Sequence, residues 1–250
     1  MARIVKEHEY IEKRNEILAA AQRLVYSKGY ERMTIGDILA ELKISSGAFY
    51  HYFDSKAAVL EAFIQRIQEE SEKPLLPIVH DPQLSALEKL QGFFSTLDQL
   101  RLAQKRTVVE LLHVWYTDEN AIVRQKVNEA VIQQRAPLLT AIVEQGIAEG
   151  SFTNAYPQHS GAVILTLLQG MGNAHAKLML TLAQDANAPG CIDAIVSIYA
   201  AYMDAIERVL GAPSHSLQRV DKDALQVWLS ALHADNSDGQ SHLAYADKLA

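Results

Sequence analysis

Residues 34–56 read TIGDILAELKISSGAFYHYFDSK and predict two short helices joined by a tight turn. Thr34 precedes the first helix with Asp37 three residues on, which is the spacing of an N-terminal capping box. Ser45 offers a cap for the second helix, in which Phe49 lies on the apolar side. A unit of this kind can place its second helix in the major groove of DNA.

The outer side of the second predicted helix is small, polar and rich in hydroxyl groups. Ser46, Gly47, Tyr50 and His51 fall on this side, and such a surface can approach DNA closely. Lys56 falls in the first turn of the next helix, where a cation opposes the helix dipole unless an anion is bound there. A phosphate contact is therefore expected for Lys56, with a solvated lysine as the alternative.

This stretch resembles the TetR family of transcriptional regulators. The resemblance rests on Gly29, on Thr34-Ile35, on Ile44-Ser45, on the run GAFYHYF at 47–53 and on Ser55-Lys56. Residues 141–150, AIVEQGIAEG, are similar to the ligand-binding half of the family, so the resemblance covers most of residues 9–211. Many relatives carry Lys or Arg where this chain has Ser46, and Arg or Lys to guanine is the strongest direct base contact. A different mode of base reading is therefore expected.

The reading that follows is a DNA-binding repressor released from a palindromic operator by a small-molecule effector. DNA-backbone contacts are expected from Thr34, Ser45, Tyr50, His51 and Lys56. Base contacts are expected from Ser46, Gly47 and Ala48, together with Tyr50 or His51.

Composition places the chain among ordinary globular proteins. It has 250 residues, 49% of them hydrophobic, and a formal net charge of −7. Residues 1–66 carry ten Lys and Arg against nine Asp and Glu, so the acidic excess lies outside the predicted DNA-binding segment. The single Cys191, the absence of an apolar leader in residues 1–10 and the lack of a membrane-length apolar run predict a cytoplasmic protein without a membrane partner.

Turn signals along the chain predict an all-α protein. Residues 1–8 are expected to form a mobile arm before a helix over 9–28, whose apolar stripe begins at Ile11. Pro137 is expected to kink or split a long helix over 121–149. The domains are expected at 1–55 for DNA binding, at 56–211 for ligand binding and dimerisation, and at 212–250 for an extra helix with a loose tail. The expected helices cover 56 to the low seventies, 84–103, 107–116, 157–182, 191–210 and 221–233.

Two apolar stripes are candidates for a homodimer interface. Small residues in the first stripe allow close helix approach, and paired helices from two chains build a four-helix bundle. The alternative is that both stripes face the core of their own chain; the resemblance favours the dimer. The proposed interface residues are Val163, Leu167, Gly170, Ala174, Leu178, Tyr199, Tyr202 and Ile206.

The candidate effector pocket combines aromatic bodies with a few polar tips, which suits a small apolar or aromatic ligand. Its residues are His113, Trp115, Tyr116, Met171, Asn173 and His175. Catalytic residues, metal ligands and cofactors are not expected, because the one Glu-x-x-His pair, Glu110 with His113, lacks the second pair that a di-iron bundle requires. Two alternatives remain open: a regulator without an effector or controlled by a protein, and an all-α enzyme.

Overall fold

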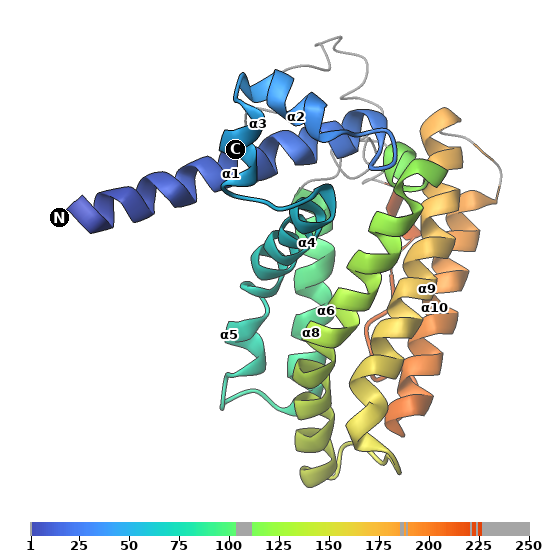
Figure 1. Ribbon diagram of the computed structural model, residues 1–250. Coiled ribbons are helices and arrows are strands. Elements are labelled where there is room, and N and C mark those ends of the chain that lie inside the picture. Colours follow the sequence, from blue (N-terminus) through green and yellow to red (C-terminus); the bar gives the residue numbers. More distant parts are fainter. Residues whose placement is uncertain are drawn as a thin grey trace. The chain divides into compact units, whose positions relative to one another are not determined.

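The computed structural model describes residues 2–103, 112–185, 188, 190–220, 222–223 and 225–226 (Figure 1). Helices are the only regular elements of these residues, which confirms the predicted all-α class. The chain folds into two compact units. The first contains residues 2–67 and His113–Val127, and the second contains the described residues of 68–112 and 128–226. Because packing alone defines these units, the predicted functional boundaries at 55 and 211 stay predictions.

The first unit contains α1 (Ala2–Lys28), α2 (Ile35–Leu42), α3 (Ser46–Tyr50) and the start of α4 (Lys56–Glu72). It also contains the one-turn helix η1 (Asp118–Asn120) and the first residues of α8 (Ala121–Ala148). Within this unit α2 packs on α1. Its most deeply buried large side chains are Ile17, Leu18, Met33, Ile38, Phe49 and Phe63.

Two predictions about α1 are wrong. The helix begins at Ala2 instead of residue 9, so it includes residues 2–8 of the segment expected to form a mobile arm. Ile11 is 52% exposed, whereas Leu18, Ala21 and Val25 are buried as expected. No Gly or Pro interrupts residues 2–28, and Ala, Glu, Lys and Arg favour helix there, so α1 runs on beyond the residues that have a core to pack against.

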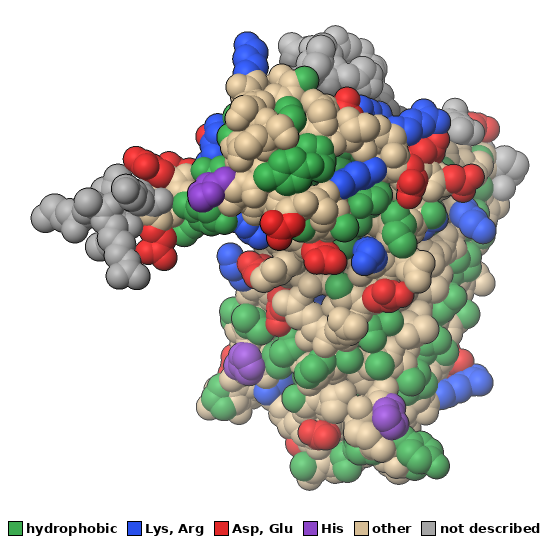
Figure 2. All heavy atoms as spheres, viewed as in Figure 1, with side chains coloured by type: hydrophobic (Ala, Val, Ile, Leu, Met, Phe, Trp, Pro, Cys, Tyr) green, Lys and Arg blue, Asp and Glu red, His purple; other side chains and the backbone are tan. Residues whose placement is uncertain are grey.

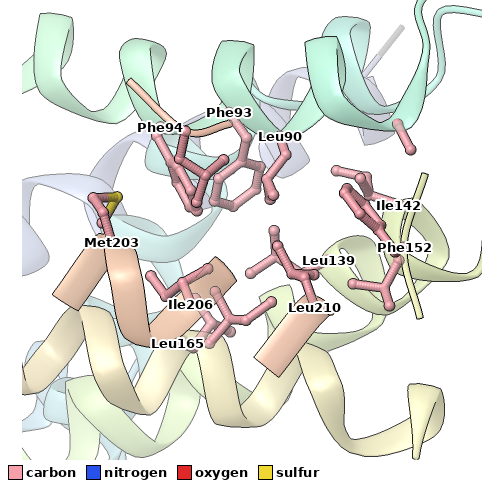
Figure 3. Close-up of a cluster of buried hydrophobic side chains, with 14 of the residues drawn as sticks. Leu90, Phe93, Phe94, Leu139, Ile142, Phe152, Leu165, Met203, Ile206 and Leu210 are labelled. Atoms are coloured by element: carbon pink, nitrogen blue, oxygen red, sulfur yellow. The ribbon is translucent and has the colours of Figure 1, made fainter. Parts of the chain in front are cut away.

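The second unit contains α5 (Leu76–Val79), α6 (Ala86–Ala103), most of α8, α9 (Pro157–Gln184) and α10 (Cys191–Leu210). Apolar side chains from α6, α8, α9 and α10 meet in one cluster that includes Phe93, Leu139 and Ile206 (Figure 3). Gly161 of α9 lies so close to α8 that an added Cβ would stand 2.1 Å from the carbonyl oxygen of Ala136. A glycine is therefore required at this helix crossing.

Other helix predictions meet mixed outcomes. The helix over 191–210 is confirmed. Of the kink or split predicted at Pro137, the split does not occur because α8 continues through it, and the kink stays a prediction. The helix predicted over 107–116 is described only from residue 112, and residues 112–115 are helical. Most of the helix predicted over 221–233 and the tail over 234–250 lie outside the described residues.

The segment that follows α10 is held by a buried carboxylate. Glu207 is 2% exposed, and its oxygens accept hydrogen bonds from the backbone N–H groups of His215 and Leu217 and from Arg219. Burial raises the pKa of Glu207, but these hydrogen bonds outweigh the effect and the pKa is lowered. Leu217 joins the buried cluster and Ala212 packs against it, so these two residues attach the segment to the second unit's core.

Candidate nucleic-acid interface

The N-terminal cap of α2 is a complete capping box, as predicted. The Thr34 hydroxyl accepts a hydrogen bond from the Asp37 N–H at 3.2 Å, and the Asp37 carboxylate accepts one from the Thr34 N–H at 2.7 Å. Lys28 forms an ion pair with Asp37 at 2.5 Å. Hydrogen bonds from Lys28 and Thr34 lower the pKa of Asp37 to about 2. The Thr34 side chain is thus committed to fixing the start of α2.

The turn between α2 and α3 has a left-handed backbone at Lys43, with φ 52° and ψ 43°. The N–H groups of Lys43 and of Ile44 both donate to the carbonyl oxygen of Leu39. A left-handed conformation costs a residue with a Cβ roughly 1–2 kcal/mol, a cost that glycine avoids. No sequence-based prediction named Lys43; the one available signal was a lysine in the tight turn before the Ser45 cap.

The helix α3 is short and is anchored by one buried ring. The Ser45 hydroxyl accepts a hydrogen bond from the Ala48 N–H at 3.2 Å, as its predicted capping role requires. Phe49 is fully buried, and the ring of Tyr50 packs edge-on against it while remaining 50% exposed. Ser46 and Gly47 are exposed, and Ala48 is half-buried. The helix therefore presents a short face of small and hydroxyl-bearing groups to solvent.

His51 and Lys56 each contact an aromatic ring outside α3. The exposed His51 ring lies edge-on to Tyr10 of α1, with ring centres 5.7 Å apart. The Lys56 Nζ donates to the carbonyl oxygen of Glu31 at 3.3 Å and stands 4.2 Å from the centre of the Tyr30 ring. The Lys56 ammonium group therefore already contacts residues of its own unit. It has three N–H donors, so it can bind a further partner while it keeps the hydrogen bond to the Glu31 carbonyl oxygen.

Asn120 links the loop before α2 to the start of α8, a contact that sequence reasoning missed. Its fully buried side chain accepts a hydrogen bond from the Tyr30 N–H at 2.8 Å. Its amide nitrogen donates to the carbonyl oxygens of Val25 at 3.3 Å and Val114 at 3.0 Å. A polar run of sequence at 117–120 predicts a helix end but gives no sign of a partner 90 residues away.

The proposed pocket residues divide between the two units. His113, Trp115 and Tyr116 belong to the first unit, where Arg124 donates to the Trp115 carbonyl oxygen. The other candidates lie on α9: Met171 belongs to the buried cluster, Asn173 is exposed, and His175 stacks on Tyr199 with ring centres 6.4 Å apart. A pocket that combines the two groups stays a prediction.

The proposed dimer residues of α9 lie on its outer side or at its contact with α10. Val163 is 42% exposed, whereas Leu167, Gly170, Ala174 and Leu178 are half-buried. Tyr199 and Tyr202 are partly buried against the core of their own chain. Ile206 is 0% exposed within one chain, so its assignment to the interface is wrong. The periodicity identified an apolar helix face correctly but did not identify what covers Ile206.

The described residues contain neither a candidate metal site nor a helix that could span a membrane. They contain no group of three or more His, Cys, Asp or Glu side chains placed to hold a metal ion. Glu110 of the Glu-x-x-His pair lies outside them. Over the same residues, the helices are too short or too polar to cross a membrane. On the face drawn in Figure 2, Lys and Arg side chains are interspersed with Asp and Glu.

Comparison with known proteins gives two matches to family models. The model described as "Bacterial regulatory proteins, tetR family" matches residues 17–63. The model described as "Tetracyclin repressor-like, C-terminal domain" matches residues 107–175.

Individual relatives agree with these matches. Over 144 residues the chain is 32% identical to the probable HTH-type transcriptional regulator ArpR and 31% identical to the HTH-type transcriptional regulator TtgR, both of Pseudomonas putida. Each alignment covers 53% of this chain and 64% of the relative, which is less than two thirds of the relative's length. The solved complex of SmeT with triclosan has a TM-score of 0.57 at 14% identity, with 84% of this chain and 96% of that chain covered.

The fold, a helix-turn-helix in the first unit and a second unit built of helices, is shared with the solved SmeT chain. Residues 17–63 and 107–175 are similar to the TetR family of bacterial regulatory proteins.

Proposed function

We propose that this protein is a transcriptional repressor that binds a palindromic DNA operator as a homodimer and releases it when a small molecule binds. The observation that carries DNA binding is the two-sided character of α3. Phe49 is fully buried and fixes the helix, while Ser46, Gly47 and Tyr50 are exposed. Such a helix can enter the major groove without losing its own anchor.

In the proposed base contacts, hydroxyl groups and the backbone take the place of the Lys or Arg side chain that many TetR-family proteins carry at the position of Ser46. Ser46, Gly47 and Ala48, with Tyr50 or His51, approach base edges, and a serine hydroxyl serves as donor or acceptor there. Thr34, Ser45, Tyr50, His51 and Lys56 contact the DNA backbone. The Ser45 hydroxyl accepts a hydrogen bond as a cap and keeps its proton for a phosphate. The Thr34 hydroxyl donates to the Asp37 carboxylate at 2.7 Å, so a phosphate must replace Asp37 as its acceptor.

The proposed homodimer forms through the outer sides of α9 and α10. Its contacts are Val163, Leu167, Gly170, Ala174, Leu178, Tyr199 and Tyr202. A two-fold axis places two recognition helices on half-sites whose centres lie about 34–36 Å apart, which makes the operator palindromic.

The proposed effector is a small apolar or aromatic molecule bound by the helical second half. Support comes from the match to the family's C-terminal domain and from the solved complex of SmeT with triclosan. The effector shifts the dimer toward a spacing that does not fit the operator, and it can do so only by binding that state more tightly. On this proposal the protein acts through binding alone, and it is not an enzyme.

DNA binding is tested by selecting duplexes from a random library with the purified dimer and measuring affinity by fluorescence anisotropy. Tyr50→Phe removes one hydroxyl from each protomer and keeps the packing on Phe49, so affinity for the selected duplex should fall about 3- to 30-fold per protomer, the loss of one hydrogen bond to a charged or polar group. Tyr156→Phe is the matched control, because Tyr156 is 69% exposed and lies at the start of α9. Failure of the wild-type protein to enrich any duplex would refute the proposed function.

Effector control is tested with the selected duplex and triclosan as the first probe. Release of the duplex at a defined triclosan concentration supports control by an apolar aromatic ligand. Mass spectrometry of the native protein, purified without detergent, identifies any small molecule that copurifies. A protein–DNA complex that neither triclosan nor small-molecule extracts of cells dissociate would support the regulator without an effector.

A further inference from the structure

Lys43 occupies a turn whose geometry does not need a lysine. The N–H groups of Lys43 and Ile44 both donate to the Leu39 carbonyl oxygen, so the backbone itself closes the turn. The φ of 52° lies in the left-handed region, where glycine fits without strain. The backbone at Lys43 is therefore strained, and a glycine would remove the strain together with the long cationic side chain.

The surrounding cations are engaged with their own chain, whereas Lys43 is free. Lys28 pairs with Asp37 at 2.5 Å and Arg23 with Glu41 at 2.7 Å. Lys56 donates to a backbone carbonyl oxygen and stands over an aromatic ring. The Lys43 side chain is exposed, and its ammonium group has no hydrogen-bond or ion-pair partner within the part of the chain that the structure describes. Its ammonium group is thus available to an external anion.

The position of Lys43 in the helix-turn-helix indicates which anion its ammonium group can reach. It lies two residues before Ser45, which caps α3, and the residues that follow Ser45 are the exposed Ser46 and Gly47. When the start of a recognition helix faces base edges, the preceding turn lies near the phosphates that border the major groove. A lysine stem of four carbons carries its charge to such a phosphate from an exposed backbone.

We propose that Lys43 is a DNA phosphate contact, placed at the turn of the helix-turn-helix in addition to the contacts of α3. It supplies affinity that does not depend on base sequence. This inference rests on the proposed DNA-binding function. It also accounts for how a unit with almost no net positive charge holds DNA, since residues 1–66 carry ten cations against nine anions.

The decisive variant is Lys43→Gly, because strain relief and charge loss have opposite effects. The melting temperature should rise by about 2–4 °C, since glycine removes the left-handed strain. Affinity for a random 40-base-pair duplex should fall about eightfold at about 0.1 M salt for each protomer bound, and the slope of log affinity against log salt should flatten by about 0.9 per protomer. A residue without a DNA role would show the stabilisation alone.

Two variants control the experiment. Lys43→Arg keeps the charge and should keep both the affinity and the salt slope. His215→Gly is the matched strain control, since His215 has a left-handed backbone at φ 62° and belongs to the second unit. It should raise the melting temperature and leave DNA affinity unchanged.

The outcomes separate this inference from the proposed function. If the wild-type protein binds neither random nor selected duplexes, DNA binding itself is refuted. If the wild-type protein binds and Lys43→Gly binds with equal affinity and equal salt slope, only the role of Lys43 is overturned. A Lys43→Gly variant that selects different base sequences, with unchanged affinity for the random duplex, would overturn the phosphate assignment.

Discussion

Replacing Asn120 with Ala should open the contact between the loop before α2 and the start of α8. The substitution removes one acceptor and two donors from a side chain with no exposed surface. The three groups that bond to the Asn120 side chain differ in whether they keep another hydrogen bond. The Val25 carbonyl oxygen retains the Gly29 N–H at 3.1 Å, and the Val114 carbonyl oxygen retains the Thr117 hydroxyl at 2.9 Å.

The magnitude follows from this inventory. Only the Tyr30 N–H loses the acceptor that the structure gives it, and an unsatisfied buried donor costs about 1–3 kcal/mol. The small cavity left by the amide adds to this cost. A loss of about 2–3 kcal/mol in the free energy of unfolding is therefore expected, which corresponds to roughly 4–12 °C in melting temperature.

The assay combines thermal unfolding with amide hydrogen exchange. In Asn120→Ala the Tyr30 amide should exchange faster than in the wild-type protein. The Glu31 amide, which donates to the Glu119 carbonyl oxygen at 3.1 Å, reports whether the neighbouring backbone contact opens with it. Unchanged stability together with unchanged protection of the Tyr30 amide would refute the assigned role of Asn120.

Asn120→Asp gives an independent check, because it keeps the acceptor for the Tyr30 N–H. The new carboxyl group faces the carbonyl oxygens of Val25 and Val114, so its pKa should be raised in the folded protein above the unfolded value. The folded state then binds the proton more tightly. The variant should therefore be closest to wild-type stability at acidic pH and lose stability as the pH rises toward the raised pKa. Urea unfolding at pH 5 and pH 7.5 measures the difference.

Further predictions concern caps, a buried acid and a helix crossing. Thr34→Ala should destabilise α2 by about 1 kcal/mol and raise the pKa of Asp37 from about 2, which an NMR titration measures. Because the pKa of Glu207 is lowered, its stabilising contribution is full above the ordinary value of 4.5 and is lost as the pH falls through the folded-state pKa; Glu207→Gln should abolish this pH dependence in urea unfolding. Gly161→Ala should cost about 1–3 kcal/mol by overpacking, whereas Gly172→Ala, with open space at the same helix, should be neutral or stabilising in thermal unfolding.

The parts of the helix-turn-helix that sequence predicted correctly are those fixed by neighbours in the chain. The caps at Thr34 and Ser45 depend on residues three positions away, so the sequence spacing contains the whole interaction. Asn120 depends on Val25 and Tyr30 across more than 85 residues, and a short polar turn does not specify such partners.

The errors elsewhere have a similar origin. Helical periodicity identified the apolar side of α1 and of α10, but periodicity does not say how far a neighbouring surface extends. Ile11 lies on the correct side of α1 and is still half exposed, while Ile206 lies on an apolar face that its own chain covers completely. Lys43 was missed because a left-handed backbone is invisible in a pattern of apolar residues.

The carboxylate of Glu207 has a consequence for the order in which the protein can complete its structure during synthesis. The acid lies near the end of α10, but the groups that satisfy it, at His215, Leu217 and Arg219, are translated afterwards. Until those residues leave the ribosome, burying the end of α10 would leave a charge without partners in an apolar setting, which is strongly unfavourable. The nascent chain is therefore expected to leave the last turns of α10 undocked until residue 219 has emerged.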